Sequence, residues 1–263
     1  MADIIYSADF IFELFNPHDE NGDSGQLLLA TKRDNTEKYV VKHEFSDCAC
    51  NEFMYHKVAE AMNLRTPKVK LIRKSKRDNI PFKFQACAIE FIEGLTKLEL
   101  DMRNTIDNFD DYFAFCALAL ILNEQDARQY FVADNKLLKL DNTSSFVEGD
   151  TLNMYLHLDK TPKKIIEVFK KNMTRMINYP IEDFWVESYI KNIAEEFGDE
   201  GKECFINTFD KFAKININDF RSALDVIEDI YNFHYSEFYR KFIQNRITES
   251  KRIVSLLKSD SIY

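Results

Sequence analysis

Hydrophobic and polar residues alternate between positions 4 and 72, as they do in β-strands. Two β-prone runs, residues 26–30 and 38–42, flank a polar segment that contains Asp34 and Asn35. Because Asp and Asn favour the tight turns that join neighbouring strands, these two runs are expected to pair as a hairpin. The N-terminal part of the chain is therefore predicted to contain a sheet.

A helical period follows between residues 50 and 64. Its apolar residues recur at spacings of three and four, which places them on one face of a helix. They are Phe53, Met54, Val58, Ala61 and Met62. Pro67 cannot continue this helix. Two further strands are predicted at residues 69–72 and 82–92, and Gly94 follows the second.

The chain becomes more helical after Gly94. Residues 112–122 are almost wholly apolar, which suits a buried helix, and the polar residues 123–126 follow directly. Two short strands, 130–132 and 137–140, are predicted next, with a polar turn between them. The second strand leads straight into a polar loop.

Helical periodicity dominates from Pro162 to the end of the sequence. Helices are expected over residues 165–177, 184–197, 204–212 and 220–239, with a long final helix after them. A boundary near residues 94–100 therefore divides a mixed α/β part, residues 1–94, from a helical part, residues 95–263. The helical part includes the polar segments near 123–146.

The composition fits a soluble globular protein. Hydrophobic residues make up 45% of the 263 residues and charged residues 30%. The net charge of −9 argues against a nucleic-acid binder, which usually carries an excess of basic residues. No apolar run reaches the ~18 residues of a transmembrane span, and the early acidic residues do not match a signal peptide. We therefore expect a cytoplasmic protein, acting in the producing cell or in a host cell.

Lys42 and Glu52 form the first candidate pair for chemistry. Lys42 ends a predicted strand, and Glu52 lies in the first turns of the helix that follows. Phosphoryl transfer from a nucleotide uses a strand lysine on the phosphates and a helix carboxylate that holds its ammonium group. The alternative is a solvated lysine and an acid that complements the helix dipole.

Asp126 and Asp141 form the second candidate pair. Asp126 follows the buried helix, and Asp141 follows the second strand of the short hairpin. Phosphoryl transfer requires one carboxylate near the acceptor hydroxyl and another on Mg²⁺, and a hairpin between them brings both to one end of a sheet. The alternative is two loop aspartates that make hydrogen bonds within turns.

The order of these motifs resembles the HipA-like kinases and the related phosphatidylinositol 3- and 4-kinases, over roughly residues 20–150. The segments that carry the resemblance are YVVK (39–42), NEF (51–53), ACAIEFIEG (86–94), LNEQDARQYFV (122–132) and LLKLDNTSSF (137–146). The resemblance implies an α+β, two-lobed protein-kinase-like fold. Its N-terminal lobe would be a small antiparallel β-rich unit with one helix, and its C-terminal lobe would be mostly helical.

The resemblance also implies the roles of individual residues. Lys42 would touch the nucleotide phosphates and Glu52 would hold Lys42. Asp126 would be the catalytic aspartate, and Asp141 would bind the metal. Ser24 and Gly25 would lie over the phosphates, whereas the adenine slot would be formed by backbone groups of Glu90, Phe91 and Ile92.

One departure from the family pattern concerns the metal. The family carries an asparagine five residues after its catalytic aspartate, and Phe131 occupies that position here. Phe131 cannot bind Mg²⁺, so the metal site would be rebuilt from Asp141 with Gln129 or Asn142. Otherwise the protein would bind nucleotide without efficient transfer.

These implications predict an ATP- and Mg²⁺-dependent phosphotransferase, most simply a HipA-like kinase that modifies Ser or Thr of a protein substrate. A pseudokinase or nucleotide-binding interaction module is the first alternative, because of Phe131. A lipid or small-molecule kinase is the second, because Leu140-Asp141-Asn142 resembles the corresponding segment of lipid kinases.

Overall fold

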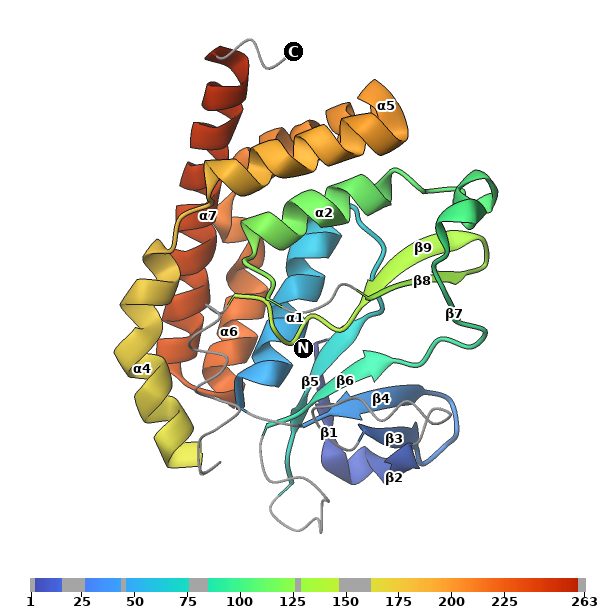
Figure 1. The fold of residues 1–263 in the computed structure, drawn as a ribbon. Helices are drawn as coiled ribbons and strands as arrows, with labels where there is room; N and C mark the ends of the chain where they lie inside the picture. The colour runs from blue at the N-terminus through green and yellow to red at the C-terminus, as the bar shows by residue number, and fades with distance from the viewer. Residues whose placement is uncertain are drawn as a thin grey trace.

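The structure is a computed structural model that describes residues 3–15, 27–43, 46–75, 85–125, 129–146 and 162–259. A curled β-sheet forms most of the N-terminal part, and helices form most of the C-terminal part (Figure 1). Among the helices of these ranges, none combines the length and the apolar character needed to cross a membrane.

The larger sheet has six strands in the order β1-β5-β6-β4-β3-β2. Their bounds are β1 Ile4–Tyr6, β2 Phe10–Phe15, β3 Leu27–Lys32, β4 Lys38–Lys42, β5 Val69–Arg73 and β6 Cys87–Glu90. All neighbouring pairs are antiparallel except β1 and β5. The predicted hairpin is confirmed as β3 and β4, with Asn35 in the left-handed conformation (φ 59°) that turns between strands favour.

Strand β6 is shorter than the predicted strand 82–92, of which residues 82–84 lie outside the described residues. It ends at Glu90 because the chain turns away at Gly94, whose positive φ of 70° is readily adopted only by glycine. Residues 91–95 therefore form a connection rather than sheet, and Phe91, Ile92 and Leu95 of this connection border a cavity of about 430 Å³.

Helix α1, Ser46–Ala61, begins four residues before the predicted start and packs against β5 and β6. It ends in a Schellman arrangement: Leu64 N–H donates to Ala59 O (2.8 Å), and Asn63 N–H donates to Glu60 O (3.0 Å). Asn63 takes the left-handed conformation that this cap requires (φ 59°). The helix carries Glu52 beneath the sheet.

A smaller, three-stranded sheet lies at the start of the C-terminal part. It consists of β7 (Thr96–Lys97), β8 (Gln129–Ala133) and β9 (Lys136–Leu140), in antiparallel order. The predicted hairpin at 130–140 is thereby confirmed. The left-handed residues Asp134 and Asn135 form its turn.

The helices of the C-terminal part are long. They are α2 Asp111–Ile121, α4 Pro162–Asn178, α5 Asp183–Ala213, α6 Arg221–Ile230 and α7 Phe233–Ser259. Short 3₁₀ helices lie at Ser7–Asp9, Leu100–Thr105 and Ile217–Phe220. The predicted helices 184–197 and 204–212 lie on either side of Gly198 within α5, where the non-helical backbone of Gly198 (φ 79°, ψ −170°) interrupts the helix. The predicted helix 220–239 is divided at Tyr231 into α6 and α7.

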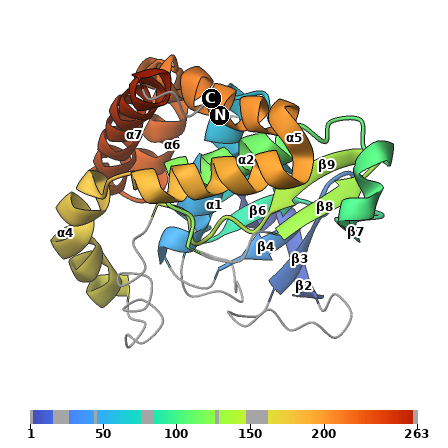
Figure 2. The ribbon, with the colours of Figure 1, turned by 45° about the horizontal axis from the view of Figure 1, so that its top comes forward.

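Helix α2 is the centre of the C-terminal core, and α5 crosses over it (Figure 2). Gly201 permits this close approach, because a Cβ atom there would lie only 2.8 Å from the Phe113 ring. The buried side chains of α1, α2, α5, α6 and α7 form one continuous hydrophobic cluster. The core thus fixes α1 and the end of β9 relative to each other, and these two elements carry the polar groups of the site.

Candidate functional site

A cavity of about 430 Å³ lies between the six-stranded sheet and the β8–β9 hairpin. One end of it is apolar, with side chains from the sheet and from β8. The other end is charged, with side chains from β4, α1 and the end of β9. The cavity wall includes Val40, Lys42, Glu52, His56, Ile89, Glu90, Phe91, Ile92, Gln129, Phe131, Lys139, Leu140, Asp141 and Asn142.

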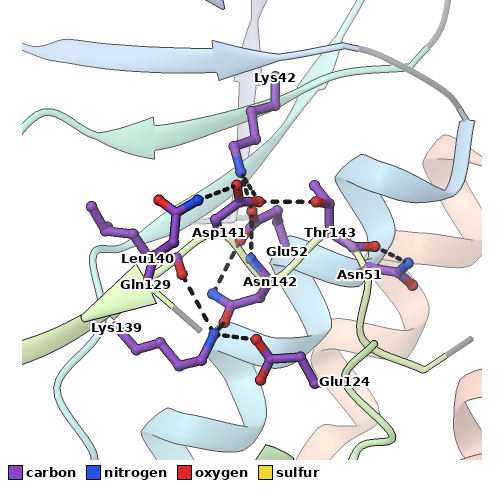
Figure 3. A network of polar contacts seen from close by, with 10 residues as sticks. All are labelled: Lys42, Asn51, Glu52, Glu124, Gln129, Lys139, Leu140, Asp141, Asn142 and Thr143. Carbon is purple, nitrogen blue, oxygen red and sulfur yellow. Dashed lines mark hydrogen bonds and ion pairs between the residues drawn. The ribbon is translucent and has the colours of Figure 1, made fainter. Parts of the chain in front are cut away.

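Lys42 lies between two carboxylates at the charged end (Figure 3). Its Nζ atom is 2.7 Å from Oε1 of Glu52 and 2.5 Å from Oδ1 of Asp141. Lys42 and Glu52 are buried, whereas the Asp141 side chain keeps 29% of its surface exposed. The structure therefore joins three of the residues selected from the sequence, although 99 positions separate Lys42 from Asp141.

The two carboxylates keep Lys42 charged. Burial alone would lower the pKa of the Lys42 ammonium group, but the Glu52 and Asp141 carboxylates hold it well above its usual range. Burial would likewise raise the pKa of the Asp141 carboxyl, and the Lys42 ammonium outweighs this and lowers that pKa. Both groups are thus charged at neutral pH, as binding of phosphate and of a cation requires.

The backbone at the end of β9 turns the Asp141 side chain into the cavity. Asp141 has a left-handed φ of 57°, a conformation that costs free energy for a residue with a side chain. The Thr143 hydroxyl donates to Oδ1 of Asp141 (2.9 Å), and the Gln129 amide donates to Oδ2 (3.4 Å). Asp141 and Gln129, the two predicted metal ligands, are therefore neighbours.

Asn142 borders the cavity, but its polar groups are hydrogen-bonded to Glu52 and Lys139 rather than to Asp141. Its side-chain nitrogen donates to Oε2 of Glu52 (3.2 Å), its backbone N–H donates to Oε1 of Glu52 (2.9 Å), and its side-chain oxygen accepts from Lys139 (2.8 Å). With only 4% of its surface exposed, Asn142 supports Glu52. These contacts favour Gln129 over Asn142 as the partner of Asp141 in a metal site.

Lys139 and Glu124 are polar residues of the site that the sequence did not reveal. The Lys139 ammonium group lies 2.6 Å from Oε1 of Glu124, and both side chains are fully buried. The only sequence signal is a lysine within the otherwise apolar end of a strand (LLKL), where a solvated side chain is the usual expectation.

The connection after β6 lines the apolar end. Glu90 N–H donates to Lys68 O (2.8 Å) and Phe91 N–H donates to Lys38 O (3.1 Å), so both are used within the sheet. In the part of the chain that the structure describes, the Ile92 N–H has no such partner. Of the three predicted adenine-slot residues, Ile92 is therefore the one whose backbone N–H can donate to a ligand.

His56 is a further cavity residue, and no sequence motif singles it out. It lies on α1, and its Nδ1 atom is 2.9 Å from the Thr66 hydroxyl. Burial, together with the nearby Lys57, lowers the pKa of His56 to about 4. The imidazole is therefore neutral at pH 7 and adds no charge to the cavity wall.

Three predicted site residues, Asp126, Ser24 and Gly25, lie outside the described residues. Phe131, which occupies the position of the family asparagine, forms part of the apolar wall. Across the described ranges, no group of three or more His, Cys, Asp or Glu side chains is arranged to hold a metal ion. Asp141 with Gln129 still fits Mg²⁺, because this ion is commonly held by one or two carboxylates together with substrate phosphates.

Neither a protein-family model nor a curated protein sequence matches the chain. Among solved structures, the fold is similar to the crystal structure of a Helicobacter pylori proinflammatory kinase, CtkA. The likeness covers 93% of this chain and 96% of that chain, with a TM-score of 0.54 and 13% sequence identity. At this identity the likeness establishes the fold alone. The expected α+β, kinase-like fold is confirmed, with its β-sheet in the N-terminal part and its helices in the C-terminal part.

Proposed function

We propose that the chain is an ATP- and Mg²⁺-dependent phosphotransferase, a HipA-like kinase that phosphorylates Ser or Thr of a protein. The observation that carries this proposal is the position of Lys42 between Glu52 and Asp141 at the charged end of a nucleotide-sized cavity. A kinase-like fold and the order of the sequence motifs support it.

Each end of the cavity has a distinct task in this proposal. The apolar end would take the adenine ring, with the Ile92 N–H as the backbone donor beside Glu90 and Phe91. Ser24 and Gly25 would cover the phosphates. Residues 1–94 would form the nucleotide-binding lobe and residues 95–263 the lobe that carries the catalytic loop.

Lys42 would bind the nucleotide phosphates while Glu52 keeps hold of its ammonium group. Without nucleotide, Lys42 is shared between Glu52 and Asp141, which neutralises the Asp141 carboxylate. On nucleotide binding, Lys42 would exchange Asp141 for a phosphate oxygen, which frees Asp141 to hold the metal together with Gln129. Bound Mg²⁺ would neutralise the charge that develops on the transferred phosphoryl group.

Asp126 would accept the proton of the attacking hydroxyl. It lies in the segment between Gln125 and Gln129, which connects α2 to β8. Because β9 pairs with β8, the Asp141 end of β9 lies opposite Gln129, with Leu140 paired directly to it. The chain thus leads from one proposed acid to the other through a single hairpin.

The direct test is incubation of the purified protein with labelled Mg-ATP, alone and with a lysate depleted of ATP. The proposal predicts incorporation of label on Ser or Thr, and its loss in Asp126→Ala. The absence of both ATP binding and label transfer in the wild-type protein would exclude the kinase assignment.

A nucleotide-binding interaction module is the second candidate, because one observation favours it. Phe131 contributes an aromatic ring to the cavity wall, at the sequence position where the family pattern has a further metal ligand. This candidate predicts ATP binding without turnover, together with a stoichiometric protein partner. Single-turnover measurement of γ-phosphate loss distinguishes it from an active kinase.

A further inference from the structure

Lys139 is a fully buried lysine two residues before Asp141. Its ammonium group contacts Oε1 of Glu124 at 2.6 Å and Oδ1 of Asn142 at 2.8 Å (Figure 3). It also lies 5.1 Å from the centre of the Tyr55 ring. Burial of two charges carries a large desolvation cost, and a well-packed apolar pair is often at least as stable. Stability alone therefore gives no reason for an ion pair at this position.

The contact between Lys139 and Asn142 spans the turn that aims Asp141 into the cavity. Asp141 is the residue with the left-handed φ of 57°, and the side chains of Lys139 and Asn142 around it are buried. A strained backbone conformation persists only where its surroundings hold it. The hydrogen bond from Lys139 to Asn142 bridges the strained residue, while Glu52 holds Asn142 from the other side.

The contact between Lys139 and Glu124 reaches the segment that leads to Asp126. Glu124 lies two residues before Asp126, and its backbone N–H donates to Ala119 O at the end of α2 (2.9 Å). The Gln125 N–H also donates to Ser144 O (3.4 Å), on the far side of the Asp141 turn. Lys139 therefore joins the entry to the catalytic loop to the turn that carries Asp141.

We propose that Lys139 is a positioning residue: with Glu124 and Asn142 it holds the Asp141 turn in the conformation that binds the metal and fixes this turn to the segment that follows α2. This inference rests on the proposed function, because it assigns the network to the same site. Loss of supporting contacts of this kind typically weakens metal binding about 10- to 100-fold.

The competing explanation is that the ion pair only fills the core. A double variant distinguishes this explanation from the positioning role. Lys139→Met or Glu124→Leu alone leaves a buried charge without its partner, which is expected to lower Tm by roughly 6–20 °C. Together, the two substitutions replace the ion pair by an apolar pair, and most of the loss in Tm should be restored. The Asn142 contact to Lys139 is still lost in the double variant.

Metal affinity is measured by electron paramagnetic resonance of Mn²⁺ in the presence of a non-hydrolysable ATP analogue. The double variant is expected to bind Mn²⁺ about 10- to 100-fold more weakly than the wild type. Affinity for the analogue without metal should stay within about twofold, because Lys42, Glu52 and the apolar wall are unchanged and the Lys139 side chain is fully buried, although its residue borders the cavity. A double variant with restored Tm and wild-type Mn²⁺ affinity would show that the pair is only structural.

A second variant tests the same inference independently, in case the double variant does not fold. Asn142→Ala keeps the Lys139–Glu124 pair and the backbone N–H bond to Glu52, but removes the side-chain link to Lys139 across the turn and the side-chain bond to Oε2 of Glu52. It should weaken Mn²⁺ binding about tenfold or more. Wild-type Mn²⁺ affinity in Asn142→Ala would overturn the inference.

The matched control removes an ion pair of α1 outside the cavity. Lys57 Nζ lies 2.9 Å from Oδ1 of Asp3, and Lys57→Met with Asp3→Leu should leave Mn²⁺ affinity unchanged. Loss of Mn²⁺ affinity in this control would contradict the assignment to Lys139. If the wild-type protein holds the analogue but no Mn²⁺, this inference fails while nucleotide binding stands. If it holds neither, the proposed function fails as well.

Discussion

At the apolar end of the cavity, Ile89 and Phe131 present hydrocarbon side chains, and the specific polar group is a backbone N–H. At the charged end, Nζ of Lys42 lies 2.5 Å from Oδ1 of Asp141, and side chains from β4, α1, β8 and β9 take part in an extended hydrogen-bond network. Many apolar residues can form the first kind of wall, whereas few side chains can replace those of the second. Substitutions at the apolar end should therefore change ATP binding by small steps, whereas single substitutions at the charged end should cause large losses of phosphate transfer or of stability.

The largest effect is expected for Asp141→Asn, which keeps the shape of the side chain but removes its charge. Without the carboxylate, the metal loses its principal protein ligand. Phosphate transfer should therefore fall at least about 1,000-fold, which corresponds to about 4 kcal/mol in the barrier. The measurement is the initial rate of label incorporation from ATP, and a loss smaller than about tenfold would remove Asp141 from the metal site.

Lys42→Met should have the next largest effect, on stability. It leaves Glu52 and Asp141 without their shared ammonium group, and breaking a buried ion pair in this way typically costs about 3–5 kcal/mol. The free energy of unfolding is measured by urea titration. Lys191→Met serves as the control and should cost about 1 kcal/mol or less, because its ion pair with Glu195 on α5 is exposed, at 74% and 66% of the two side chains. Equal losses in the two variants would contradict the central role of Lys42.

His56 should make the stability of the protein depend on pH. Its pKa is about 4 in the folded protein, against about 6.5 in the unfolded chain, so the unfolded state binds more protons between these values. The free energy of unfolding should therefore fall as pH drops from 6.5 to 4, by about 3 kcal/mol from this group. His56→Gln should remove that share of the pH dependence, and an unchanged profile would show that His56 is not buried as a neutral group.

The smallest effect is expected for Val40→Phe at the apolar end. Val40 and Lys42 lie on the same face of β4, because side chains alternate along a strand, and both line the cavity. A larger side chain should intrude into the adenine slot and weaken ATP binding about tenfold, or about 1.4 kcal/mol. The control is Ile11→Phe, at an exposed position on β2, which should bind ATP as the wild type does. Equal affinity in both variants would place the nucleotide elsewhere.

The two ends of the cavity also differed in how far the sequence could predict them. The sequence indicates Lys42, Glu52 and Asp141 because each is a charged residue in, or directly after, a strand or helix whose periodicity is clear. The structure brings the three side chains together. The hairpins and α2 were predicted for the same reason. The roles predicted for Lys42, Glu52 and Asp141 stay predictions, as do those of Asp126 and of residues 24–25, which lie outside the described residues.

The sequence could not show the features that depend on tertiary contacts. The hydrogen bonds of Asn142 to Glu52 and Lys139 follow from the left-handed backbone at Asp141, which no local pattern specifies. A lysine near a strand end, such as Lys139, is ordinarily solvated, and only the packing of the core reveals that Glu124 lies beside it. The use of the Glu90 and Phe91 N–H groups within the sheet likewise depends on strand pairing.

The central claim is that the charged end of the cavity binds a nucleotide together with Mg²⁺ through Asp141. Calorimetric titration of ATP into the wild type and Asp141→Asn, with Mg²⁺ and with EDTA, tests it most directly. We predict that Mg²⁺ tightens ATP binding at least about tenfold in the wild type, and that this gain disappears in Asp141→Asn. The absence of ATP binding in the wild type, or an equal gain from Mg²⁺ in both proteins, would contradict the claim.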